Sequence, residues 1–176
     1  MAEIKSTLDL VMEKTKHLKM SDSERKALDV EETLKKVPGL VQKYMDGALK
    51  DRDFRNGVVE YCKVDSEAVK KEIVKELARA LTFKGKERDL KVVKALQNLE
   101  LNNAGNLIDE LKNCLETFYE EQNKLVDEKT ATYLDELEKA GIRGSAVVPK
   151  AILRQEDLAR LQPIKATCLN LLSRLI

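Results

Sequence analysis

The sequence predicts an all-α protein that folds as an elongated helical bundle. Apolar residues recur at three- and four-residue steps along most of the chain, which is the period of an amphipathic helix. The 176 residues include only 4% aromatic residues, 7 glycines and 3 prolines. The chain is also 36% charged, and the straight side chains of Leu, Lys and Glu lose little rotamer freedom in a helix.

Two helices are predicted at the start of the chain. The first covers about residues 3–18, where apolar side chains recur every three or four residues. Ser21 and Glu24 have the spacing of a capping box, in which each side chain accepts a hydrogen bond from the other residue's backbone amide. This pair predicts that a second helix begins at Ser21 and continues to about residue 36.

Pro38 predicts a break in the helical pattern. Proline has no amide hydrogen and disfavours helix in the residue before it. We therefore expect the second helix to end at Val37 and a third helix to cover about residues 38–51. Residues 52–64 are ambiguous, but a lone strand there has no partner for its backbone hydrogen bonds. Helix or irregular structure is therefore favoured.

The clearest helical pattern covers about residues 66–83. Asp65 is a favourable N-cap, because its carboxylate can accept a backbone amide of the first turn. Gly85 is expected to end the helix, since glycine adopts the left-handed conformation without steric cost. The expected buried face consists of Val69, Ile73, Leu77, Ala80 and Leu81.

Two long antiparallel helices over about residues 86–101 and 104–140 form the spine of the predicted bundle. Residues 102–106, Asn-Asn-Ala-Gly-Asn, predict the corner between them, and Gly141 is a natural C-cap. The second helix is about 55 Å long at ~1.5 Å per residue. Its apolar stripe thins over residues 120–129, which indicates that part of it projects into solvent or contacts a partner.

The C-terminal part of the chain is predicted to hold a short extended segment over 142–149 and a helix interrupted at Pro163. We expect a single domain, in which residues 1–141 form the bundle core and residues 142–176 pack against it. Residues 101–141 carry 4 basic and 10 acidic residues, whereas 142–176 carry 6 and 2. The basic C-terminal segment is therefore expected to return onto the acidic spine.

Charge, hydropathy and cysteine content limit the class of protein. The net charge is +1, so no overall field attracts the chain to nucleic acid or to an anionic membrane. The N-terminus lacks a signal-peptide core, and no run approaches the ~20 apolar residues of a membrane span. We expect a cytoplasmic protein. Cys62, Cys114 and Cys168 fit no zinc-binding spacing, and buried reduced thiols are their expected state.

No catalytic constellation is apparent. His17 is the only histidine, and Glu13 could share its helical face. A catalytic metal site needs three or more protein ligands, and His17 lies beside no nucleophile motif. We interpret Glu13 and His17 as a solvated surface pair, and expect no enzyme activity, metal or cofactor. An enzyme that uses scattered acidic residues is a third, less favoured hypothesis.

Lys84, Lys86 and Arg88 lie at a predicted helix start, where backbone amides attract anions. No phosphate-loop motif accompanies them. These residues form either a basic interhelical loop or a contact for phosphate or nucleic acid.

Two apolar segments near the C-terminus are candidates for partner binding. Val147 and Val148 face opposite ways if 142–149 is extended. This segment is therefore either core filler strapped across the helices or a strap that leaves one valine for a partner. Leu172 and Leu175 belong to an apolar terminal helix that must bury its face in the core or in a second subunit.

Residues 3–15, Glu-Ile-Lys-Ser-Thr-Leu-Asp-Leu-Val-Met-Glu-Lys-Thr, and residues 144–149, Gly-Ser-Ala-Val-Val-Pro, resemble a family of uncharacterised bacterial proteins of similar length. The match is confined to these two segments. The resemblance implies a small helical protein of the bacterial cytoplasm and assigns no activity or site residues.

The favoured functional hypothesis is a non-enzymatic interaction or scaffold protein that presents helical faces to a protein partner, including a second copy of itself. The alternative is association with nucleic acid or the ribosome through the basic region over residues 63–94.

Overall fold

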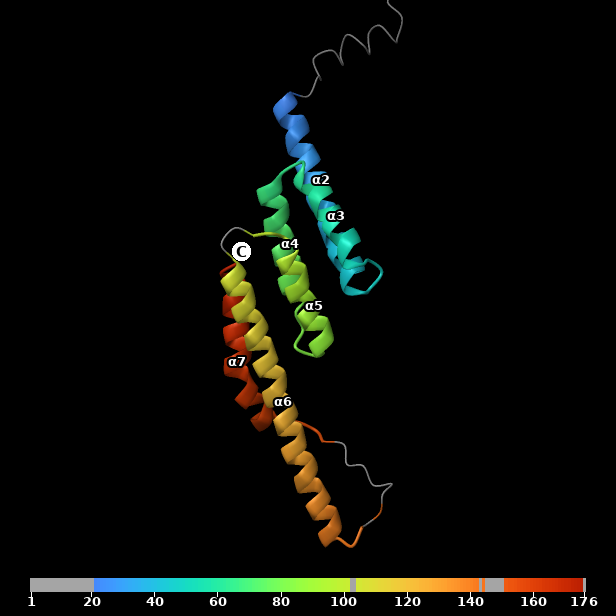
Figure 1. Cartoon of the computed structure of the whole chain (residues 1–176), viewed down its shortest axis with the longest axis vertical. Helices are drawn as coiled ribbons and strands as arrows, with labels where there is room; N and C mark the ends of the chain where they lie inside the picture. Colours follow the sequence, from blue (N-terminus) through green and yellow to red (C-terminus); the bar gives the residue numbers. More distant parts are fainter. Residues whose placement is uncertain (1–20, 102–103, 143, 145–150, 176) are drawn as a thin grey trace, which may run out of the picture.

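The computed structural model describes residues 21–101, 104–142, 144 and 151–175. Six helices and no strands lie in these residues, which confirms the predicted all-α bundle (Figure 1). The helices are α2 (Asp22–Met45), α3 (Asp51–Cys62), α4 (Ser66–Ala80), α5 (Lys86–Gln97), α6 (Gly105–Lys139) and α7 (Gln155–Ser173).

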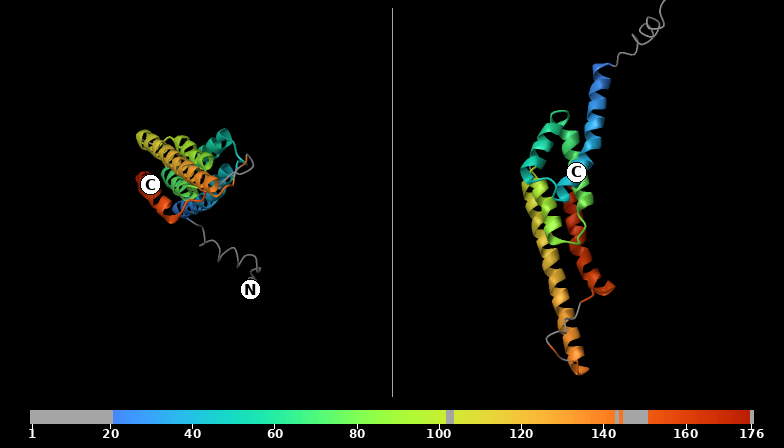
Figure 2. Two further views of the ribbon diagram at one scale, coloured as in Figure 1. Left: turned by 90° about the horizontal axis from the view of Figure 1, so that it is seen from below. Right: turned by 90° about the vertical axis from the view of Figure 1, so that its right-hand side faces the viewer.

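Consecutive helices run in alternating directions, and the bundle is elongated (Figures 1 and 2). The predicted spine corresponds to α5 and α6, which pack against each other, and α6 is the longest described helix with 35 residues. Helix α7 packs along α6, and α2 packs against α4. The C-terminal segment therefore returns onto α6 as expected from its charge.

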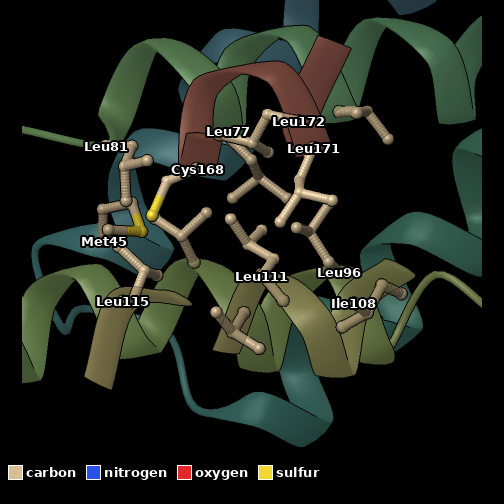
Figure 3. Close-up of a cluster of buried hydrophobic side chains, with 14 of the residues drawn as sticks. Met45, Leu77, Leu81, Leu96, Ile108, Leu111, Leu115, Cys168, Leu171 and Leu172 are labelled. Carbon is tan, nitrogen blue, oxygen red and sulfur yellow. The ribbon is translucent and has the colours of Figure 1, made fainter. Parts of the chain in front are cut away.

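The core is one continuous cluster to which every described helix contributes. Figure 3 shows its central part, where side chains of α7 lie opposite those of α6. Each fully buried Leu, Val or Phe contributes about 1.5–3 kcal/mol through removal of its surface from water. The largest fully buried side chains are Tyr44, Phe54, Ile73, Leu77, Leu96, Leu99, Leu111, Leu115, Leu172, Val37, Val69 and Val74.

Several local signals act as the sequence predicts. Ser21 and Glu24 form the capping box: the Ser21 amide donates to Glu24 Oε2 at 2.8 Å, and the Glu24 amide donates to Ser21 Oγ at 3.2 Å. Asp65 caps α4 by accepting the Ala68 amide at 2.9 Å. The ambiguous residues 52–64 are helical over most of their length, as α3.

The predicted break at Pro38 is wrong, because α2 continues through it to Met45. Val37, Val41 and Tyr44 are at most 3% exposed and follow one another on the buried face of this helix. Pro38 itself lies on the exposed face. Burial of that apolar stripe offsets the loss of one backbone hydrogen bond at the proline. The helix expected over 38–51 is therefore the second half of α2.

The interruption predicted at Pro163 is also wrong, since α7 runs unbroken from Gln155 to Ser173. The proline is exposed, while Leu161 and Cys168 on either side of it are buried. Contacts of these side chains with the core keep both halves of α7 in one helix.

The end of α4 differs from the prediction as well. The helix ends at Ala80, and Gly85 is the N-cap of α5 rather than the terminator of α4. Asp89 causes this turn: its buried carboxylate accepts the amides of Thr82 at 3.2 Å and Phe83 at 2.8 Å. These bonds hold Phe83 at a φ of +57°.

The expectation of reduced thiols is wrong for two of the three cysteines. Cys114 of α6 and Cys168 of α7 form a disulfide, whose Cα atoms are 5.9 Å apart. Cys62 is the free cysteine and is half-buried at the end of α3. Two cysteines 54 positions apart thus join consecutive helices covalently, which residue spacing alone did not indicate.

The core and the far end of α6 are expected to respond differently to truncation. Leu77→Ala removes a fully buried side chain and is expected to lower the free energy of unfolding by about 2–5 kcal/mol. Leu134→Ala is the matched control, because Leu134 is 46% exposed, and it is expected to change that free energy by at most about 0.5 kcal/mol. Urea unfolding followed by circular dichroism measures both. Equal losses in the two variants would contradict this assignment of the core.

Candidate interaction surfaces

The distal end of α6 projects beyond the other helices (Figure 1). We call residues 126–142 the arm. Leu125 is the last buried residue of α6, and no residue of the arm is buried. Val126, Tyr133 and Leu137 are half-buried, whereas Leu134 and Ile142 are 46% and 50% exposed. Part of α6 projects as predicted, but its place differs from the prediction. Residues 120–129, where the apolar stripe thins, include the buried Leu125 and side chains that pair with α7. The projecting part follows them and leaves apolar side chains open to solvent.

The arm is acidic, and two ion pairs join its base to α7. It carries five acidic and two basic residues. Lys129 pairs with Asp157 of α7 at 3.2 Å, and Glu128 pairs with Arg160 at 3.5 Å. The Arg154 amide, and then Lys129, lower the pKa of Asp157, so this carboxylate stays ionised at neutral pH. Beyond these pairs, the arm has no described helix beside it.

Lys84 lines a cleft of about 240 Å³ between the α4–α5 turn and α7. Phe83 and Phe118 form part of its apolar wall, and the Lys165 ammonium lies 5.1 Å from the centre of the Phe83 ring. Lys86 and Arg88, the other predicted anion contacts, are exposed on the first turn of α5 and do not line this cleft. Of the three predicted anion contacts, Lys84 is the one that lines this cleft.

A second cleft, of about 270 Å³, is lined by Arg55, Lys63 and Lys70. Two of these cations bind the C-terminal end of α5. Arg55 donates to the Asn98 side chain at 2.8 Å, and Lys70 donates to the Glu100 carbonyl at 3.3 Å. Cations near a helix C-terminus stabilise its dipole and its free carbonyls. Lys70, which belongs to the basic region over 63–94, therefore helps to stabilise the folded structure.

The candidate partner-binding leucines differ in exposure. Leu172 is 2% exposed and lies in the core beside Leu111 of α6, as Figure 3 shows. Leu175 is half-buried and lines a cleft of about 550 Å³ together with Val74 and Leu101. The apolar face of the terminal helix is therefore largely covered within the single chain. Val147, Val148, Glu13 and His17 lie outside the described residues.

Two buried tyrosines each donate a hydrogen bond to a carboxylate. Tyr119 donates to Asp89 at 2.5 Å, and Tyr44 donates to Asp51 at 2.8 Å. Burial, and then the bond to the carboxylate, raise the pKa of both tyrosines above the ordinary value. None of these four residues lines the clefts described above. Their hydrogen bonds tie the α4–α5 turn to α6, and α2 to the start of α3.

Within the part of the chain that the structure describes, every buried side-chain nitrogen and oxygen atom has a hydrogen-bond partner. The described residues also contain no group of three or more His, Cys, Asp or Glu side chains with the geometry of a metal site. No described helix combines the length and apolar character that crossing a membrane requires.

Comparison of the chain with protein-family models, with curated proteins and with solved structures finds no match. The resemblance at residues 3–15 and 144–149 therefore identifies no family. The structure supports its coarser implication, a small all-helical protein.

Sequence reasoning missed Asp89 and the disulfide. A signal for Asp89 was present, because it shares the helical face of Val92, Val93 and Leu96, where a charged residue needs buried partners. No such signal exists for the cysteines. A separation of 54 residues does not reveal which turns of α6 and α7 face each other.

The buried tyrosines predict a loss of stability in alkali. Because the pKa of Tyr119 is raised in the folded state, its stabilising contribution is complete below the ordinary pKa of 10.0 and is lost as pH rises above it. Each such tyrosine lowers the free energy of unfolding by about 1.4 kcal/mol per pH unit in that range. The free energy of unfolding of Tyr119→Phe is therefore expected to fall less steeply with pH, by this amount, between about pH 10 and 11.5.

Tyr44→Phe is the matched second variant and is expected to change the slope equally, because Tyr44 bonds Asp51 in the same way. The measurement is urea unfolding at a series of pH values. If the free energy of unfolding of both variants fell with pH as steeply as that of the wild-type protein, the raised pKa of these tyrosines would be contradicted.

Proposed function

We propose that this chain is a non-enzymatic interaction protein whose arm contacts a protein partner. The observation that carries the proposal is the projection of α6 beyond the bundle with Leu134 and Ile142 about half exposed. Apolar side chains gathered on an exposed surface favour association. Ile152, which is 66% exposed shortly before α7 begins, adds to the apolar surface of this part of the chain.

The charge of the arm supports a partner with a basic face. Acidic side chains alternate with the apolar ones along the arm, and only two lysines offset them. Complementary charge raises the association rate and selects among partners. A second copy of the chain is the other candidate occupant, and the oligomeric state in solution distinguishes the two.

The carboxylates that accept hydrogen bonds from the buried tyrosines support a non-enzymatic role. Asp89 and Asp51 accept hydrogen bonds that stabilise turns and helix ends, and the tyrosines that donate to them stay protonated at neutral pH. We place the protein in the cytoplasm as part of the same proposal. Disulfides in that compartment are usually transient or redox-sensing.

Point variants test the arm without disturbing the core. Removal of residues 142–176 would strip Leu161, Cys168 and Leu172 from the core. We therefore choose Leu134→Glu, and as control Leu169→Glu, which alters a residue of α7 that is similarly exposed. A partner captured by the tagged wild-type protein is expected to bind the arm variant at least tenfold more weakly and the control with unchanged affinity.

Light scattering after size-exclusion chromatography of the same three proteins reports whether the partner is a second copy. A monomeric wild-type protein that captures no partner, or a partner that binds both variants equally, would remove the basis of the proposal.

A second candidate function, contact with nucleic acid, is favoured by the meeting of Lys84 and Lys165 at one cleft, near the exposed Lys86 and Arg88. Phosphate contacts release counterions, so such binding weakens steeply as salt rises.

The triple variant Lys84→Ala, Lys86→Ala, Arg88→Ala tests this second function. It is expected to lower affinity for a fluorescein-labelled RNA oligomer by at least tenfold at 50 mM salt. The control is Lys63→Ala, Lys71→Ala, Lys75→Ala, which removes equal charge elsewhere on the same predicted region. Absent binding, or binding insensitive to salt, would contradict this function.

A further inference from the structure

Helix α7 is held to the bundle mainly through a single neighbouring helix. Among the described helices, it packs substantially only against α6. Three of its buried residues, Cys168, Leu171 and Leu172, lie on the C-terminal side of Pro163, and Leu161 and Asp157 lie on the other side. The proline lacks the amide that would bond the carbonyl of Ala159. The hydrogen bonding of α7 is therefore weakest between its two contact regions.

The disulfide adds a covalent tie at the centre of this packing. Cys168 is completely buried, and Figure 3 shows its sulfur beside Met45 and Leu115 in the core. Cys114 on α6 is half-buried. The bond spans 54 positions of sequence. The loop that it closes contains the whole arm, the segment that returns from the arm, and most of α7.

Both redox states are compatible with the fold. A free cysteine behaves as a small apolar side chain with a weak donor, and the surroundings of Cys168 are apolar. In the disulfide-bonded structure, Cys114 Sγ already lies 3.5 Å from the Ile164 carbonyl oxygen, so the thiol formed by reduction has an acceptor within reach. Reduction therefore removes the tie without leaving a charge or an unsatisfied group in the core.

We propose that the Cys114–Cys168 pair is a redox-controlled tie that sets how often α7 detaches from α6. In the oxidised state, detachment of α7 is limited by the bond to α6. In the reduced state, α7 is held by its apolar contacts and by the ion pairs of Asp157 and Arg160. Opening then exposes the α6 face of Leu111 and Leu115.

Reduction of the Cys114–Cys168 disulfide requires a dithiol or an equivalent two-electron reductant. One thiolate of the dithiol attacks Cys114 Sγ, the more accessible sulfur, and Cys168 leaves as a thiolate that takes up a proton. The second thiolate of the reductant then displaces Cys114. The reductant becomes a cyclic disulfide, and two electrons and two protons pass to the two cysteines.

Hydrogen exchange of the full chain, with and without dithiothreitol, tests this tie. The background is Cys62→Ser, which removes the free thiol. The protein is oxidised with glutathione disulfide, denatured and alkylated, and no thiol is expected to be modified. After reduction, two thiols are expected to be modified. Reduction is expected to accelerate amide exchange in α7 at least tenfold, while exchange in α4 and α5 changes less than twofold.

The variant Cys62→Ser, Cys114→Ser, Cys168→Ser is the control. Its amide hydrogens are expected to exchange at the rates of the reduced protein, and addition of the reductant is expected to leave these rates unchanged. Two alkylated thiols in the oxidised sample would show that the tie does not form. Unchanged exchange of α7, or equal acceleration in all helices, would overturn its assignment to α7. These outcomes are independent of partner binding by the arm.

Discussion

The apolar face of α6 between Ile108 and Leu125 is the surface on which the rest of the structure depends. Helix α5 packs on it from one side and α7 from the other, and α7 packs substantially on no other described helix. The same helix continues past Leu125 without buried residues. One continuous helix therefore supplies both the centre of the core and the exposed arm. The change from one to the other comes beside the first turn of α7, beyond which no described helix covers α6.

The two prolines show how this core governs local structure. Pro38 and Pro163 each lie on an exposed helix face opposite buried residues. A proline inside a helix costs about 3 kcal/mol, which is comparable to burial of one or two large apolar side chains. Each helix buries more than that. The helices therefore continue where local rules predict breaks.

The basic residues are divided among different tasks. Lys70 and Arg55 stabilise the end of α5, Lys129 holds α7 at the base of the arm, and Lys84 remains beside a cleft. A count of charges along the chain cannot make this division, because it depends on which helix end each side chain reaches. The acidic residues of the arm differ from these basic residues, because they lie together in one segment of sequence.

The sequence by itself determined the helical class, the capping box at Ser21, the N-cap at Asp65 and the extent of α6, because these features depend on side chains within a few residues of one another. It also indicated that part of α6 projects, although the apolar stripe thins over residues 120–129 and the projecting end follows them. Only the tertiary structure decided that α2 and α7 pass through their prolines, that Asp89 bonds Tyr119 and that Cys114 meets Cys168. Each of these depends on contacts between residues distant in the chain, whose free energy no local pattern contains.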